Sequence, residues 1–369
     1  MLRFVAAVVL ICMLTGCDGD QRILENLGMV QTSSYDLGDN NKLRVTSSLP
    51  IPDPDATLKR IVLTAETDSI KEARLIFSNQ TELDVVSGQL RNTLFGLNLA
   101  KDGLGSHIDT LLRDPSVALG VKVTIVNGEA SELLAKNYKQ HQDTGQYITR
   151  LLEKESTGNT IPKITLYEFS RDYNDDGIDP VAPLLKDAGE HAAVDGIALF
   201  QDDRYIMKIP AKDGLIFAIF RGTIKQGEIA LDLEDSTGQK ESVMFSSVSS
   251  KRKVKVHHLD RNRFKVDITA SIQGSVLEYT GQHKLFKKDQ RLELEKLIAD
   301  HISSRAEQMI KEMQQNKVDS LGIGQYVRNS LSYAEWKNLD WRKVYPEIEV
   351  ECHSKVLIKD YGKYTRTKG

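Results

Sequence analysis

The chain has 369 residues, of which 40% are hydrophobic and 27% charged, and its 49 lysines and arginines nearly balance its 52 aspartates and glutamates. A chain of this length is too long for one ordinary domain, so we expect two or three domains and more than one hydrophobic core. The balanced charge excludes a strongly basic protein, and we expect no nucleic-acid partner.

The N-terminus has the pattern of an export signal. Arg3 supplies a positive charge, and the apolar run over residues 4–14 is too short to span a bilayer as a helix. The run closes on Leu14, Thr15, Gly16 and Cys17. This ending resembles the lipobox of bacterial lipoproteins, in which a diacylglycerol is attached to the cysteine sulfur before cleavage makes that cysteine the first residue.

The expected product is a signal peptide over residues 1–16 and a mature chain that begins at an acylated Cys17. Two acyl chains hold a protein stably at a membrane, whereas one chain holds it only marginally. The alternatives are an uncleaved anchor and an ordinary signal peptide with a chance cysteine. No later segment is long and apolar enough to cross a bilayer, so we expect the rest of the chain on the far side of the membrane. Cys352 is then the one cysteine left outside the signal and the anchor, and we expect it to be buried and inert.

The first half of the chain alternates strand-like and helix-like segments. Strands are expected within residues 28–54 and over 60–64, 88–95 and 119–126, and helices over 69–77, 97–112, 130–136, 147–154 and 162–169. Ser69 is the expected N-cap of its helix, and Gly103 and Gly105 are expected to break residues 97–112 into two short helices. This alternation indicates an α/β part, which ends at an acidic loop over residues 172–177.

From about residue 193 the pattern changes to closely spaced strands. They are expected over residues 194–200, 204–209, 224–233, 241–245, 251–258 and 264–273. A long amphipathic helix is expected from about residue 289, because its apolar residues recur at steps of three and four. A short helix within residues 318–327 and a final strand over 347–358 complete the chain.

The order of motifs in the C-terminal third is distinctive. The long helix is followed by Gln314-Gln315, Asp319, Gly322-Ile323-Gly324, Trp336-Lys337, Trp341 and Tyr345-Pro346, and then by a strand that ends near Gly362. Upstream, Leu111-Leu112-Arg113-Asp114-Pro115 precedes a strand, and Val194-Asp195-Gly196-Ile197-Ala198-Leu199-Phe200 opens the second half. Together with Cys17, this order resembles the Ger(x)C family, the lipoprotein C subunits of spore germinant receptors, over nearly the whole mature chain.

The resemblance implies a multi-domain α+β fold of mixed sheets surrounded by helices, with a long C-terminal amphipathic helix followed by a strand. Three domains are expected: an N-terminal α/β domain over residues 17–190, a middle β-rich domain over 191–248 and a C-terminal α+β domain over 249–369. It also implies a diacylglyceryl anchor on the outer face of the inner spore membrane, with two multi-spanning partners, the A and B subunits of a germinant receptor.

The motifs of common enzymes are absent from the sequence. There is no nucleophile elbow, no phosphate-binding loop and no zinc-binding histidine pair, and the glycines of residues 103–107 have no strand leading into them as a Rossmann turn requires. We therefore expect a non-enzymatic subunit with no catalytic residues and no cofactor. The main alternative is a solute-binding lipoprotein of a membrane transporter, and an exported enzyme is the third.

Two charged segments offer candidate binding sites. Residues 172–177 match the first half of a calcium loop, but Pro180 and Pro183 occupy its ninth and twelfth positions, so an acidic turn is the better interpretation. A basic stripe is expected along one strand and the turn after it, formed by Lys251, Lys253, Lys255, His257, Arg261, Arg263 and Lys265. Such a stripe can contact anionic lipid headgroups, although a solvated or edge-protecting face is commoner.

Aromatic and histidine residues complete the candidates. Trp336, Trp341 and Tyr345 form either a satellite core on the long helix or a contact for a partner subunit. His257 and His258 are adjacent on a strand and point to opposite faces, so they cannot share a metal ion. The other histidines considered, His283, His301 and His353, lack partners at ligand spacing, and we expect no metal site.

Overall fold

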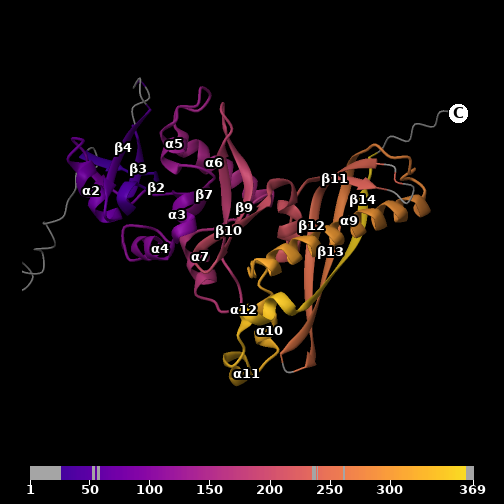
Figure 1. Cartoon of the computed structure of the whole chain (residues 1–369). Coiled ribbons are helices and arrows are strands. Elements are labelled where there is room, and N and C mark those ends of the chain that lie inside the picture. Colours follow the sequence, from indigo (N-terminus) through magenta and orange to yellow (C-terminus); the bar gives the residue numbers. More distant parts are fainter. Residues whose placement is uncertain are drawn as a thin grey trace, which may run out of the picture.

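The computed structural model describes residues 26–51, 55, 59–234, 238, 240–260 and 262–362. Its architecture is α+β with two main sheets and surrounding helices (Figure 1), as the sequence predicts. The expected lipobox and Cys17 lie outside the described residues. None of the helices in the described part of the chain is both long and apolar enough to cross a membrane.

The larger sheet has eight strands in the order β10-β9-β8-β7-β6-β2-β3-β4. These strands are β2 (Thr32–Leu37), β3 (Leu43–Pro50), β4 (Arg60–Thr67), β6 (Asn92–Gly96), β7 (Lys122–Val126), β8 (Val181–Asp187), β9 (Ala192–Gln201) and β10 (Arg204–Pro210). The four central strands β2, β6, β7 and β8 are parallel, and antiparallel strands extend the sheet on both sides. A separate short pair joins β1 (Leu27–Met29) to β5 (Asp84–Val86).

Helices accompany this sheet. They are α2 (Ile70–Ser78), α3 (Leu97–Asp102), α4 (Gly105–Leu112), α5 (Ala130–Ala135), α6 (Thr144–Thr157) and α7 (Leu166–Tyr173). Helix α8 (Gly214–Arg221) contacts β10 of this sheet and also β12 and β13 of the smaller one. Every residue of β6 is buried, which is usual for a parallel strand covered on both faces. The Ser69 hydroxyl accepts a hydrogen bond from the Glu72 amide at 3.2 Å, so the predicted cap of α2 is confirmed. Gly103, with φ of 133°, separates α3 from α4 at the predicted place.

The smaller sheet has the order β11-β12-β13-β14. Its strands are β11 (Ile229–Glu234), β12 (Lys240–Asp260), β13 (Arg263–Tyr279) and β14 (Glu349–Asp360). The strands expected over residues 241–245 and 251–258 are parts of one long strand, β12, which bends at register shifts against β13. The final strand β14 pairs parallel with β13.

Four helices belong to this part of the chain: α9 (Lys288–Gln315), α10 (Ile323–Asn329), α11 (Tyr333–Lys337) and α12 (Trp341–Val344). The long helix α9 lies along β14 (Figure 1), with an apolar face that includes Leu294, Ile298 and Ile302 buried against the sheet. Side chains on the opposite face of the sheet, such as Lys253 and Lys255, are exposed. The three short helices follow α9 and lie beneath the junction of the two sheets (Figure 1).

The strands of residues 191–248 are divided between the two sheets. Strand β9 forms a hairpin with β8 and joins the larger sheet with β10, whereas β11 and the first part of β12 join the smaller one. In the described part of the chain, this segment therefore has no sheet of its own. The three-domain division at residues 190 and 248 stays a prediction. Buried apolar side chains of both sheets belong to one connected core.

Candidate functional site at the junction of the two sheets

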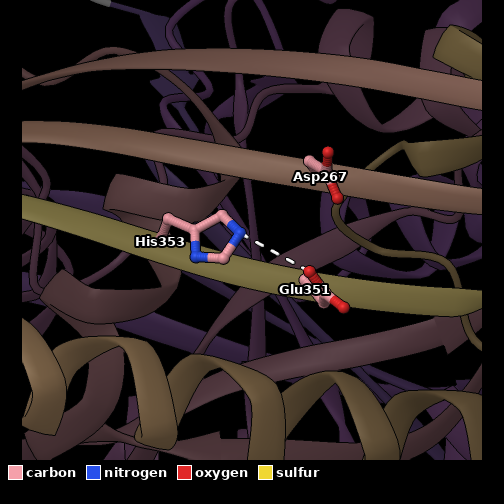
Figure 2. Close-up of side chains that lie close together, drawn as sticks. All are labelled: Asp267, Glu351 and His353. Atoms are coloured by element: carbon pink, nitrogen blue, oxygen red, sulfur yellow. Dashed lines mark ion pairs between the residues drawn. The ribbon is translucent and has the colours of Figure 1, made fainter.

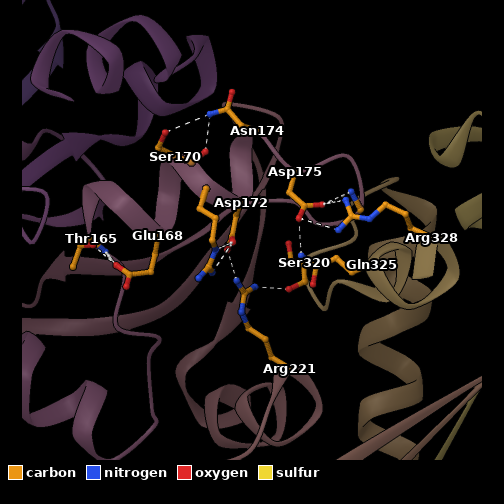
Figure 3. Close-up of polar contacts among 12 residues, drawn as sticks. Thr165, Glu168, Ser170, Asp172, Asn174, Asp175, Arg221, Ser320, Gln325 and Arg328 are labelled. Atoms are coloured by element: carbon orange, nitrogen blue, oxygen red, sulfur yellow. Dashed lines mark hydrogen bonds and ion pairs between the residues drawn. The ribbon is translucent and has the colours of Figure 1, made fainter. Parts of the chain in front are cut away.

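The acidic turn of residues 172–177 lies where the two sheets meet. A capping box of Thr165 and Glu168 fixes the start of the preceding helix α7, and the Asn174 side chain donates to the Ser170 carbonyl at 2.7 Å at its end (Figure 3). The turn is therefore held at a defined place on the larger sheet. Its carboxylates point toward residues that are distant in the sequence.

Asp172 is the buried carboxylate of the turn. It accepts hydrogen bonds from Arg171 and from Arg221 at the end of α8, each at 2.7 Å, and only 1% of its side chain is exposed. Arg221 also donates to the Ser320 carbonyl, on the segment after α9 (Figure 3). Burial lowers the pKa of the Arg221 guanidinium, and the Asp172 charge opposes that shift. Arg221 therefore connects the larger sheet to the C-terminal helices.

Asp175 forms a second contact, which is partly exposed. Arg328 of α10 donates to both of its oxygens, at 2.7 and 3.3 Å, and the Gln325 side chain donates at 3.0 Å (Figure 3). Burial acts to raise the pKa of Asp175, but these hydrogen bonds outweigh burial and leave the pKa lowered. Asp176 makes an exposed pair with Lys337 at 3.1 Å. The turn thus pairs with basic side chains from other elements of the fold. Its interpretation as an acidic turn stays a prediction.

On the C-terminal side of the junction, the carboxylate of Asp319 is buried and accepts several hydrogen bonds. Its oxygens accept hydrogen bonds from the backbone amides of Ile323 and Gly324, at 2.9 and 2.6 Å, and from the Trp341 indole at 3.1 Å. The Asp319 amide itself donates to the carboxylate of Asp179, which lies in the loop between α7 and β8, at 2.7 Å. Burial raises the pKa of Asp319 to about 7, and its hydrogen-bond donors oppose this shift.

The predicted aromatic residues lie beside Asp319. The ring centroids of Trp336 and Trp341 are 5.9 Å apart, and those of Trp341 and Tyr345 are 5.6 Å apart. All three side chains are buried, and the Gln314 side chain of α9 donates to the Tyr345 carbonyl at 3.0 Å. They therefore pack as a small aromatic cluster at the end of the long helix. Contact of these residues with a partner subunit stays a prediction.

A polar cleft of about 610 Å³ opens between the turn and these rings. Its walls carry aspartates from both parts of the chain, together with Lys337 and Arg342. Arg342 pairs with Asp202 and lies 3.6 Å from Asp179, so charges of opposite sign face one another across the cleft. Ligand pockets are usually apolar with a few converging polar groups. This cleft differs, because charged side chains that pair across the junction form much of its walls.

The predicted basic stripe lies on the open face of the smaller sheet. Lys251, Lys253 and Lys255 are exposed along β12, and Arg261 lies outside the described residues. Acidic groups interrupt the stripe, because His257 pairs with Asp267 at 2.8 Å and Lys265 pairs with Glu351 at 2.5 Å. Contact of this face with lipid headgroups stays a prediction.

The junction also depends on residues that the sequence did not single out. Arg221, Arg328 and Arg342 each pair with an aspartate that is 49 to 153 positions away. The sequence around a single arginine does not indicate which distant aspartate it will pair with. Asp319 belonged to the motif order of the C-terminal third, but its burial could not be recognised from that order.

The fold and the junction define a class: a multi-domain α+β protein whose two unlike sheets are joined through ion pairs and a shared core. Two family models match the chain. The model described as spore germination protein N-terminal domain matches residues 20–187, and the one described as spore germination B3/GerAC like, C-terminal, matches residues 195–362. The chain belongs to this GerAC-like family of spore germination proteins.

Individual relatives agree with this assignment. Spore germination protein GerQC of Bacillus cereus is 23% identical over 362 residues, which cover 98% of this chain and 99% of the relative. Putative spore germination protein YfkR of Bacillus subtilis (strain 168) is 24% identical over 384 aligned positions, covering 97% and 96%. The crystal structure of the GerBC protein matches with a TM-score of 0.58 at 14% identity, over 89% of this chain and 96% of that one, and has the same fold.

Proposed function

We propose that this chain is the lipid-anchored C subunit of a nutrient germinant receptor. It acts without catalysis, through protein–protein contacts on the outer face of the inner spore membrane, and its partners are the multi-spanning A and B subunits. The observation that carries the proposal is the pair of family matches, which together span residues 20–187 and 195–362.

The anchor is Cys17, released as the first residue by cleavage after Gly16. The first described strand, β1, begins at Leu27, so ten positions separate it from the cysteine (27 − 17). A chain of that length spans at most about 35 Å. The larger sheet would therefore stay close to the bilayer surface, within reach of the extracellular parts of a membrane partner.

The junction favours a scaffold over a solute-binding lipoprotein. A solute-binding protein closes two similar lobes around a cleft, by motion about a hinge. In the described residues one sheet has eight strands and the other four. Asp175 and Asp179 bond directly to the C-terminal segment, and Asp172 is connected to it through Arg221, which also donates to the Ser320 carbonyl. Such ties oppose the opening and closing that a solute-binding cycle requires.

Affinity capture tests the proposal. The tagged chain is captured from detergent-solubilised inner spore membranes, and the co-purifying proteins are identified by mass spectrometry. We expect two multi-spanning partners with the unaltered chain and their reduction or loss with Cys17→Ala. Cys352→Ala is the matched control, because that thiol is buried in the fold and should not affect anchoring.

Other outcomes would contradict the proposal. Recovery of a nucleotide-driven transporter, or of no partner under gentle conditions, would favour the solute-binding alternative or an exported enzyme. Titration of the purified chain with amino acids and sugars separates these further, since tight binding of a single solute by the isolated chain is expected only of a solute-binding protein.

A further inference from the structure

Three side chains with metal-binding atoms meet on the open face of the smaller sheet. Asp267 belongs to β13, and Glu351 and His353 belong to β14 (Figure 2). Asp267 and Glu351 are direct neighbours across the parallel pair of strands, and His353 lies two residues further along the same face. One ligand atom from each residue lies within 4.8 Å of the other two.

The carboxylates of Asp267 and Glu351 face each other across two neighbouring strands, and each already has one basic partner. Like charges that face each other across neighbouring strands destabilise a sheet. One oxygen of each carboxylate is hydrogen-bonded to a basic side chain. His257 lies 2.8 Å from one oxygen of Asp267, and the Lys265 amine lies 2.5 Å from Oε1 of Glu351. Glu351 Oε2 lies 3.7 Å from Nε2 of His353.

The second oxygen of Asp267 is an unusual feature of this face. Oδ1 is shielded from solvent and has no hydrogen-bond partner among the residues that the structure describes. A shielded carboxylate oxygen without a hydrogen-bond partner costs free energy, because its desolvation is not compensated. A cation held between Asp267 and Glu351 would satisfy this oxygen and offset the repulsion of the two carboxylates.

We propose that Asp267, Glu351 and His353 bind a divalent transition-metal ion, with zinc as the best match to their chemistry. Zinc takes imidazole nitrogens and carboxylate oxygens at about 2.0–2.2 Å in a tetrahedral arrangement, which places its ligands roughly 3.3–3.5 Å apart. About half of the Glu351 and His353 side chains is exposed, 47% and 55%, so rotations of these side chains can bring the three atoms to this separation. Water completes the coordination.

His257 would position the site. Its ring nitrogen lies 2.8 Å from Oδ2 of Asp267, so it restrains the rotation of this carboxylate while Oδ1 stays without a hydrogen-bond partner. The bound ion would link two strands that are 84 positions apart (351 − 267) and would fasten the C-terminal strand β14 to the β12–β13 hairpin.

Zinc titration of the mature full-length chain tests the site. The protein is purified in detergent, stripped of metal with a chelator and titrated calorimetrically with zinc chloride. We expect one zinc ion per chain, and at least tenfold weaker binding in His353→Asn and in Glu351→Gln. His191→Asn, at an exposed histidine before β9, is the matched control and should bind zinc as tightly as the unaltered chain.

Cobalt provides an independent readout, because Co²⁺ in a four-coordinate site has strong visible absorption bands that octahedral, solvent-bound cobalt lacks. These bands should appear with the unaltered chain and disappear with Asp267→Asn. Circular dichroism confirms that each variant is folded. The proposal is overturned if the unaltered chain binds no zinc, or if His353→Asn and His191→Asn bind it equally well.

Discussion

Asp319 links several segments at the junction through its hydrogen bonds. Its two oxygens accept three N–H groups, and its own amide donates to Asp179 in the loop before β8. Glycine is required at position 324, because a Cβ there would lie 2.5 Å from the Trp341 indole nitrogen. One buried carboxylate therefore fixes the start of α10 and the orientation of a tryptophan in α12.

Replacing Trp341 by phenylalanine removes one of these hydrogen bonds. The ring is retained in part, but Asp319 loses the indole donor, so we expect the free energy of unfolding to fall by about 1–3 kcal/mol. Urea unfolding measures the change. Trp336→Phe is the control for lost ring volume in the same cluster. Equal losses in the two variants would mean that the hydrogen bond to Asp319 adds nothing.

The pH dependence of stability reports the Asp319 carboxyl directly. Its pKa is about 7 in the folded chain, against an ordinary value of 3.8. Between these values the folded chain holds a proton that the unfolded chain has released, so this group's contribution to stability is full below about pH 4 and is lost as the pH rises to 7. Comparison of the unaltered chain with Asp319→Asn by urea unfolding should show the variant's deficit shrinking over this interval. A deficit that grows with pH would contradict the raised pKa.

At the scale of elements, α9 protects the free edge of β14. Side chains of the helix accept hydrogen bonds from three amides of the strand: Glu307 from Cys352 at 3.0 Å, Ser303 from Ser354 at 2.9 Å and Glu295 from Ile358 at 2.9 Å. An unpaired strand edge is a template for association with another chain. The helix thus covers the sheet with its apolar face and closes the sheet edge with its polar residues.

The double variant Glu295→Ala, Glu307→Ala should open this edge. Two amides of β14 lose their acceptors, so we expect hydrogen exchange at Cys352 and Ile358 to become at least tenfold faster, and the chain to self-associate more readily. Exchange is followed by mass spectrometry and association by sedimentation. Asp300→Ala removes an exposed acid from the same helix and is the control. Unchanged exchange at both amides would argue against a protective role.

The individual helices and strands show how much the sequence could predict. The Ser69 cap, the break at Gly103 and the long helix α9 were predictable, because each depends on residues close together in the chain. Helix α8 was missed, since its eight residues are almost all apolar and buried, and such a run has the pattern of a buried strand as much as that of a helix. The Asp267, Glu351 and His353 cluster was also hidden, because parallel pairing of β13 with β14 creates it.

Across the whole molecule, the turn of residues 172–177 determines how the two sheets are held together. The ion pairs that Asp172 and Asp176 of this turn make differ in how far they are buried. Asp172 and Arg221 have 1% and 17% of their side chains exposed, whereas Asp176 and Lys337 have 59% and 53% exposed. Exposed pairs contribute about 0–1 kcal/mol, but removing one partner of a buried pair costs about 3–5 kcal/mol, because the other charge stays buried without compensation.

The turn therefore offers a matched pair of substitutions. Asp172→Asn leaves the buried Arg221 with the Ser320 carbonyl and no carboxylate, and we expect a loss of about 3–5 kcal/mol in the free energy of unfolding. Asp176→Asn makes the same chemical change four residues away and should cost no more than about 1 kcal/mol.

Urea unfolding, followed by tryptophan fluorescence and circular dichroism, measures both variants. Both tryptophans lie beside the junction, so in Asp172→Asn the fluorescence transition should move to lower urea than the transition seen by circular dichroism. Separate transitions would mean that Asp172 couples the C-terminal helices to the larger sheet. Coincident transitions with equal losses in the two variants would mean that the shared apolar core alone holds the sheets together.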